Sequence, residues 1–201
     1  MVSMNDRSLD NQTPEIETPR RRGGFWIEII KFTLITLVIV IPFRIYIAQP
    51  FIVSGASMDE TFADGEYLIV DQLSHRIEEP KRESVIIFKY PKDTTKYFIK
   101  RVIGLPGETV EINDGKVTIL NKDNPNGMVL NEPYIAEKNE KKDTFSITLG
   151  KGEYFVLGDN RLGSLDSRSW GPVPEKLIVG RPLVRLLPLQ RLNAFPGDYS
   201  N

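Results

Sequence analysis

Residues 25–48 read FWIEIIKFTLITLVIVIPFRIYIA, a strongly apolar run that divides the chain into two unlike parts. Its strictly uncharged stretch, residues 32–43, has 12 residues and is by itself too short to cross a hydrocarbon core of about 30 Å. With its flanks the run would extend about 36 Å as a helix at 1.5 Å per residue. Lys31 and Arg44 lie near its ends, where long side chains can reach the lipid headgroups. The run therefore predicts a single transmembrane helix.

Two other readings of this run are a buried core helix and a cleavable secretory signal, which also has a basic front and a short apolar core. A cut after Ala48 would place the large Tyr46 in the small-x-small site, so the sequence favours an uncleaved anchor. Arg20 to Arg22 precede the run and few basic residues follow it, which predicts a cytoplasmic N-terminus.

The parts on either side of the anchor differ in composition. Residues 1–24 are polar and lack an apolar period, so we expect a disordered cytoplasmic tail. Residues 49–201 would then form a catalytic domain on the outer face of the plasma membrane. Within them, residues 121–143 are polar and contain an Asn-Pro pair, which predicts an excursion from the folded core.

Residues 49–201 are predicted to be mainly β. Short runs of β-branched and aromatic residues alternate with turn formers, and Asn113-Asp114-Gly115 is a strong hairpin signal. The predicted strands are residues 66–71, 84–90, 97–103, 109–112, 116–120, 144–149 and 154–157. We therefore expect a barrel-like or sandwich β-domain that is tethered by one N-terminal transmembrane helix.

Composition excludes several classes of function. The 201 residues carry a formal net charge of -1, so no basic field favours a nucleic-acid partner. The chain has no cysteine and one histidine, His75, which excludes disulfides and a Cys-His pair and makes a zinc site improbable. We expect no metal and no cofactor. A Ser-His-Asp triad would have to use His75, and a serine with a neutral lysine is the remaining common route to amide hydrolysis.

Three separated segments fit that route: SGASM at 54–58, KRVIGLPGE at 100–108 and GDNRLGSLDSR at 158–168, followed by WGPVPE at 170–175. Each alone has the composition of an ordinary turn or strand. Together, in this order and behind an anchor, they resemble bacterial type I signal peptidase, the membrane-bound serine protease that removes signal peptides from exported preproteins. The resemblance implies preprotein signal peptides with small residues before the cut site as substrates, and membrane lipid as the surroundings.

By this resemblance Ser57 is the nucleophile and Lys100 is the general base. Strand alternation places Phe98 and Val102 on the face of Lys100. An ammonium among apolar groups loses hydration, which lowers its pKa from about 10.4 and frees a neutral amine to take the serine proton. Alternation alone does not say which face is inward, and a solvated lysine paired with an acid is the other reading.

The third segment is expected to support this pair. The resemblance implies that Ser164 aims the Lys100 amine by a hydrogen bond. It also implies that Asp166 pairs with Arg168, and that Asp159 and Arg101 extend the ionic network. Groups that orient a catalytic pair from behind are needed because such a pair tolerates little misplacement.

The first segment is expected to form the oxyanion hole and part of the substrate cleft, with Ser54, Gly55 and Met58. Gly55 and Ala56 are small enough to admit a substrate backbone, and the Ser57 amide can point at the oxyanion. The second donor is left open among the Gly55 amide, the Ser54 hydroxyl and water.

Two departures from the family pattern bear on alternatives. Glu60 stands where relatives usually have proline, and Leu162-Gly163 replaces a polar pair. They are the features expected of a catalytically silent membrane-tethered domain that binds preproteins or partners. A self-cleaving DNA-bound repressor also uses a Ser-Lys pair, but it needs a DNA-binding helical module where this chain has a polar tail and an apolar helix.

Overall fold

The computed structural model describes residues 22–46 and 48–198, so residues 1–21 of the predicted tail lie outside the described residues. The chain divides into two compact units, residues 1–40 and 41–201. The helix α1 comprises Arg22–Tyr46, beginning three residues before the predicted anchor and ending two residues before its predicted end.

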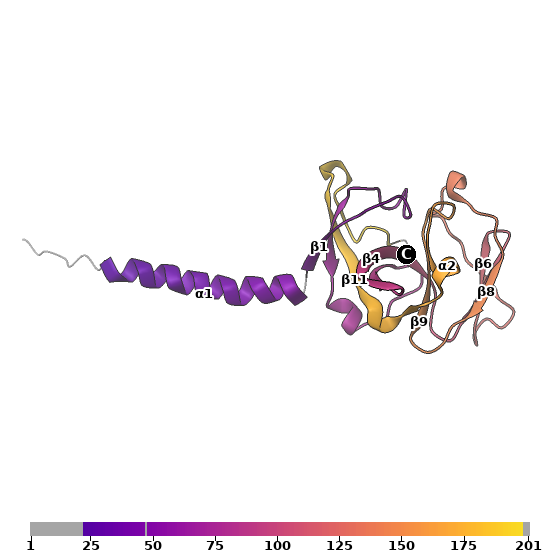
Figure 1. Ribbon diagram of the computed structural model, residues 1–201, viewed down its shortest axis with the longest axis horizontal. Coiled ribbons are helices and arrows are strands. Elements are labelled where there is room, and N and C mark those ends of the chain that lie inside the picture. The colour runs from indigo at the N-terminus through magenta and orange to yellow at the C-terminus, as the bar shows by residue number, and fades with distance from the viewer. Residues whose placement is uncertain (1–21, 47, 199–201) are drawn as a thin grey trace, which may run out of the picture. The chain divides into compact units, whose positions relative to one another are not determined.

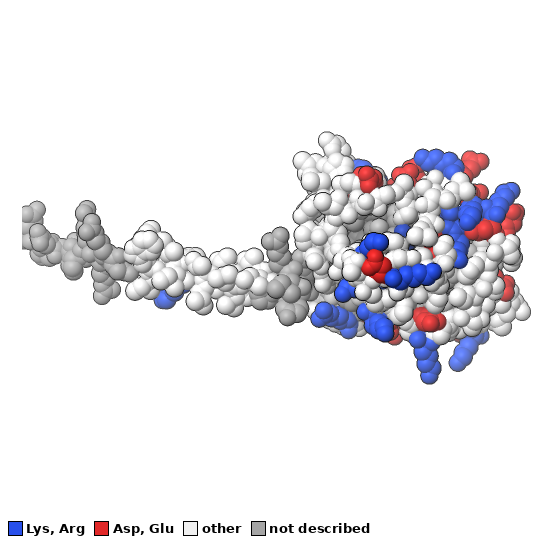
Figure 2. Space-filling model, in the orientation of Figure 1, with Lys and Arg blue, Asp and Glu red and all other residues white. Residues whose placement is uncertain are grey.

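The helix α1 is apolar along most of its length. Residues 24–41 have a mean hydropathy of 2.1 and none is buried, so this segment is long and apolar enough to cross a membrane. Figure 2 shows the surface of α1 as largely uncharged, whereas acidic and basic side chains mix over the β-domain. An exposed apolar helix of this kind fits a lipid environment, as the sequence predicts.

The β-domain contains two antiparallel sheets (Figure 1). The strands of the larger sheet are β1 (Ala48–Ile52), β2 (Tyr67–Asp71), β3 (Val85–Tyr90), β4 (Asp93–Gly104), β9 (Glu153–Leu157), β10 (Val173–Pro174), β11 (Ile178–Leu187) and β12 (Asn193–Ala194). Their order is β1-β2-β11-β3-β4-β9-β10, and β12 pairs with β11. The smaller sheet has the order β7-β6-β5-β8 and comprises β5 (Thr109–Asn113), β6 (Lys116–Leu120), β7 (Met128–Val129) and β8 (Phe145–Thr148).

Short helical segments lie between these strands. They are η1 (Ser74–Arg76), η2 (Glu137–Asn139), α2 (Ser167–Trp170), η3 (Glu175–Leu177) and η4 (Leu189–Arg191). Two of the elements, β7 and η2, fall within the predicted excursion at 121–143, which therefore adds a short edge strand to the smaller sheet.

The prediction of a mainly β domain behind one apolar helix is confirmed, but the expected barrel-like closure is wrong. The larger sheet is open, with β1 at one edge and β10 at the other. The edge strand β10 has only two residues, and its Pro174 has no N–H to donate to a further strand. Closure into a barrel would require a continuous hydrogen-bonded ladder between the two edges.

The core packs on both faces of the central strands. In β9, Phe155 and Leu157 join an apolar cluster with β5 and β6, while Tyr154 and Val156 join a second cluster with β3. The end of β4 is likewise buried on both faces. Strands covered on both sides are held firmly in place, so β4 and the turn after β9 are rigid supports for the side chains that they carry.

Candidate active site

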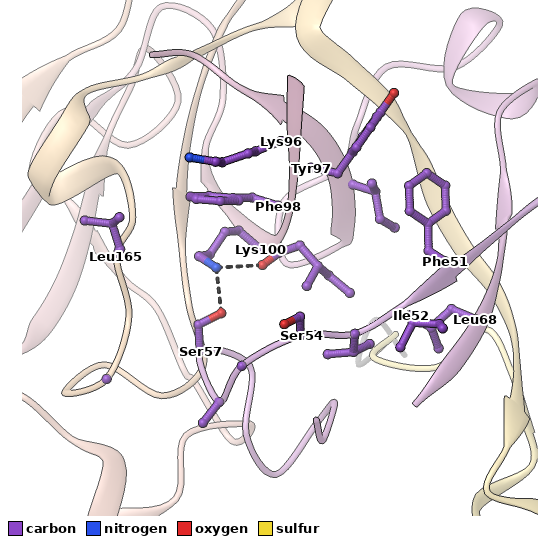
Figure 3. A pocket seen from close by; sticks show the side chains of 16 residues that line it. Phe51, Ile52, Ser54, Ser57, Leu68, Lys96, Tyr97, Phe98, Lys100 and Leu165 are labelled. Atoms are coloured by element: carbon purple, nitrogen blue, oxygen red, sulfur yellow. Dashed lines mark hydrogen bonds between the residues drawn. The ribbon is translucent and has the colours of Figure 1, made fainter. Parts of the chain in front are cut away.

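An open groove of about 490 Å³ lies between the chain at residues 51–57 and the outer half of β4 (Figure 3). Its lining is mostly apolar and includes Phe51, Ile52, Tyr97 and Phe98, of which Phe51 and Tyr97 contact each other edge to face at 5.3 Å between ring centres. Ser57 and Lys100 also line it. The groove thus brings together residues of the first and second sequence motifs, which are more than 40 positions apart.

Lys100 and Ser57 are in direct contact. Lys100 Nζ lies 2.7 Å from Ser57 Oγ and donates a second hydrogen bond of 2.9 Å to the carbonyl oxygen of Ile99 (Figure 3). The strand β4 presents the lysine to the groove, and the loop after β1 presents the serine. This geometry is within the reach that a base needs to take a hydroxyl proton.

The Lys100 side chain is buried, with 3% of the residue exposed. Its Nζ lies 5.4 Å from the centre of the Phe98 ring, on the face that strand alternation predicts. Burial lowers the pKa of Lys100 from 10.5 to about 8, although the charges of Asp166 and Asp159 act in the opposite direction. Desolvation therefore makes a neutral amine available near neutral pH.

Ser164 lies close to the pair but makes no hydrogen bond to Lys100 Nζ in the described part of the chain. Its hydroxyl is buried beside Gly158, where an added Cβ would overlap both Ser164 Oγ and the Ser57 carbonyl oxygen. Gly158 is thus required for Ser164 to approach the backbone of the nucleophile. The orienting bond from Ser164 stays a prediction.

The loop that carries Ser57 contains the hydrogen-bond donors that the sequence suggests for the oxyanion hole. Gly55 adopts φ +88, a conformation that favours glycine, and its amide donates a 2.7 Å hydrogen bond to Asp64 Oδ1. This bond occupies one of the amides considered for the oxyanion hole. Ser54 lines the groove, whereas Met58, expected at the cleft, is 1% exposed and packs in the core instead.

Arg101 and Asp159 form a fully buried ion pair behind the site. Arg101 Nε and one terminal nitrogen bond the two Asp159 oxygens at 2.9 and 2.6 Å, so the pair is bidentate. Thr61 Oγ1 also donates to Asp159 at 2.5 Å. Because Arg101 follows Lys100 directly, this pair fixes the backbone of the lysine to the turn after β9.

Asp166 and Arg168 form the second ion pair that the motifs predict. Arg168 bonds Asp166 through Nε and one terminal nitrogen at 2.8 and 2.7 Å, and its other terminal nitrogen reaches Asp143 at 2.8 Å. Asp166 also accepts from the Gly158 amide at 3.2 Å and caps α2. Hydrogen bonds from Arg168 lower the pKa of Asp166 against the effect of its burial, so the carboxylate stays ionised.

Asn160 contacts the loop that carries Ser57, a role that the sequence did not predict. Its amide donates to the Ser57 carbonyl at 3.1 Å, and its side chain donates to the Ala56 carbonyl at 3.0 Å. The turn after β9 therefore holds the backbone of this loop by hydrogen bonds to the carbonyl groups of Ala56 and Ser57. The position of Asn160 inside the third motif was the available signal.

Two other sequence features have a clear place in the structure. Glu60 has φ +77, a conformation that proline cannot adopt because its ring fixes φ near −65°. His75 lies in η1.

Comparison with known proteins shows to which family the chain belongs. Residues 26–187 match the family model described as signal peptidase, peptidase S26. The chain is 37% identical to signal peptidase I of Bacillus amyloliquefaciens, covering 84% of this chain and 88% of the relative. It is 33% identical to signal peptidase I T of Bacillus subtilis over 85% of this chain and 90% of the relative.

A relative from Synechocystis sp., probable signal peptidase I-2, is 33% identical over 86% of this chain and 78% of its own length. A solved structure of a signal peptidase I from Enterococcus faecalis V583 is 34% identical, with a TM-score of 0.44, and covers 52% of this chain and 97% of that chain. The family match over most of the chain and the identities above 30% lead to one conclusion: the chain belongs to the signal peptidase I family, peptidase S26.

Proposed function

We propose that this protein is a serine endopeptidase in which Ser57 is the nucleophile and Lys100 the general base, and that it removes signal peptides from exported preproteins. Membership of the signal peptidase family makes it a membrane-anchored signal peptidase. The observation that carries the catalytic assignment is the 2.7 Å contact between Lys100 Nζ and Ser57 Oγ at the floor of the groove. The metal-free and cofactor-free mechanism expected from the sequence needs only these side chains.

In the first step the neutral Lys100 amine takes the Ser57 hydroxyl proton as the oxygen attacks the scissile carbonyl carbon. The Lys100 ammonium then returns a proton to the leaving amine, which departs with the mature protein. A water molecule, activated by the same amine, hydrolyses the acyl ester at Ser57 and releases the signal peptide. The serine and lysine are restored at the end of the cycle.

The oxyanion formed in each step needs donors beside Ser57. The Ser57 amide makes no hydrogen bond within the described residues, so it is available for this role. The Gly55 amide is bonded to Asp64. The Ser54 hydroxyl, which lines the groove, is therefore our assignment for the second donor.

The neutral amine explains why a hydroxyl such as Ser164 would be useful. A neutral lysine has one lone pair and two N–H groups. When the lone pair accepts from Ser57, one N–H bonds the Ile99 carbonyl and the other is left for Ser164. A Ser164 bond of this kind would fix the rotation of the amine so that its lone pair faces the nucleophile.

The groove and the anchor suit the substrate. An extended peptide can lie along the mostly apolar groove, and from the signal peptidase family we expect small residues before the cut site. We place the tail of residues 1–24 in the cytoplasm and the domain of residues 49–201 on the outer face of the plasma membrane. A signal peptide's cut site would then lie near the surface where this domain is tethered.

The test is cleavage of a preprotein by the purified full chain in detergent micelles, with N-terminal sequencing of the product. We expect one cut after a small residue, and no cut by Ser57→Ala. A wild-type protein that binds the preprotein but leaves it intact would instead identify the silent binding domain, which Glu60 and Leu162-Gly163 would suit.

A further inference from the structure

Residues 131–143, which we call the strap, contact residues of the second and third motifs and Glu60. The contacts pair Glu132 with Arg161, Tyr134 with Arg101, Lys138 with Glu60, Asn139 with Leu162 and Asp143 with Arg168. Their partners lie in the second motif, in the third motif and just beyond the first. A segment that looks like a polar excursion in the sequence is thus joined to two of the three motifs and to the chain just after the first.

The contact between Glu132 and Arg161 is the most enclosed ion pair among these. The two side chains are 9% and 4% exposed and form a bidentate pair, with one of the two bonds at 3.2 Å. Tyr134 donates to Glu132 at 3.0 Å, and its ring stacks on the Arg101 guanidinium at 3.9 Å. Arg161 and Tyr134 therefore hold the Glu132 carboxylate from two sides.

Arg161 passes this constraint to the turn after β9. Its Nε donates to the Gly158 carbonyl at 3.1 Å, which closes residues 158–161 into a fixed turn. Asn160 of the same turn donates to the carbonyls of Ser57 and Ala56. A continuous path of hydrogen bonds thus runs from Glu132 through Arg161 and the turn to the backbone of the nucleophile.

We propose that Glu132 is a positioning residue for the Ser57–Lys100 pair, acting through Arg161 and the turn at residues 158–161. The proposal rests on the proposed function. A misplacement of the reacting groups by about 1 Å can cost about 10²-fold in rate. A buried bidentate pair that fixes this turn therefore affects turnover through the position of Ser57. The Lys138–Glu60 pair is 66% and 48% exposed, and an exposed pair of this kind contributes little.

The test uses Glu132→Gln in the full chain in detergent micelles, with steady-state cleavage of a preprotein measured well below the unfolding temperature. Glutamine keeps the size of the side chain and an acceptor for Tyr134 but loses the paired charge. We expect kcat to fall by roughly 10- to 100-fold, with KM within about twofold. The pKa that governs the pH profile should stay near 8, because the surroundings of Lys100 are unchanged.

Two further variants make the outcome decisive. Tyr134→Phe removes the hydroxyl that donates to Glu132 and should lower kcat by about two- to fivefold, less than the full worth of a hydrogen bond to a charged group, because the pair with Arg161 still holds Glu132. Glu137→Gln removes an exposed acid of the strap and should keep the wild-type kcat.

A folded Glu132→Gln protein with wild-type kcat would overturn the proposal, and so would a loss confined to KM. If Glu132→Gln does not fold, Tyr134→Phe decides, and an unchanged kcat in that variant overturns the proposal. Failure of the proposed function is distinguishable, because the wild-type protein itself would then not cleave the preprotein.

Discussion

Lys100→Met should inactivate the protein and at the same time stabilise it at neutral pH. Burial lowers the pKa of Lys100 from 10.5 to about 8. Each pH unit corresponds to about 1.4 kcal/mol, so holding a protonated Lys100 in the folded state costs about 3 kcal/mol. Methionine fills a similar volume without a charge but loses the hydrogen bonds to Ser57 and to the Ile99 carbonyl, together worth about 2 kcal/mol. We expect a net gain of about 1 kcal/mol in the free energy of unfolding.

The pH dependence has a definite sign. Below pH 8 both the folded and the unfolded lysine are protonated, so the full cost is present. Between pH 8 and 10.5 only the unfolded state holds the proton, and the wild-type protein therefore gains stability as pH rises. The advantage of Lys100→Met should be constant below about pH 8 and should vanish by about pH 10.

The assay is urea unfolding of the full chain in detergent micelles at pH 7 and pH 10, followed by the fluorescence of Trp170, which packs against Phe88 and Tyr90. With a slope of about 2 kcal/mol per molar urea, the midpoint at pH 7 should rise by roughly 0.5 M. Lys116→Met, at an exposed position of β6, is the control and should not move it. A Lys100→Met midpoint at or below that of wild type at pH 7, or a gain that persists at pH 10, would refute the reasoning.

The remaining predictions concern turnover and topology. For the wild-type protein kcat/KM should rise about tenfold from pH 7 and level off above pH 9, because the fraction of neutral Lys100 follows a pKa of about 8. A rise in kcat/KM that continues to about pH 10.5 would mean that the pKa of this lysine is not lowered. Ser164→Ala should lower kcat by about 10²-fold with KM little changed, and full activity in steady-state cleavage would remove its orienting role. Protease added outside intact cells should digest residues 49–201, and protection until lysis would contradict the orientation that Arg20 to Arg22 predict.

The sequence predicted the local elements that have strong local signals. The helix and the strands β2 to β6 were found because apolar runs and the Asn113-Asp114-Gly115 turn mark them without reference to the rest of the chain. The strand β11 was missed, since Gly180 and Pro182 interrupt its apolar pattern. The structure accommodates this proline beside the register shift with β2 between Pro182 and Val184.

The site and its two supporting ion pairs were predicted in composition, but the contacts that the strap adds were not. Resemblance of three motifs placed Ser57 and Lys100 together, although strand alternation alone left open which face of β4 is buried. The contact of Glu132 with Arg161 depends on how residues 121–143 return to the domain, and no local pattern encodes that path. Closure of the sheet was mispredicted for the same reason, because the pairing of edges is decided by long-range packing.

The central claim is that Ser57 and Lys100 act as one unit, and the most direct measurement is preprotein cleavage by Ser57→Ala, Lys100→Ala and the double variant. Each single variant should lose roughly 10³-fold or more in kcat while remaining folded, and the double variant should be about as inactive as either, since residues that act together are not additive. His75→Ala should retain activity. A Lys100→Ala protein that cleaves at the wild-type rate, beside an inactive His75→Ala protein, would contradict the account.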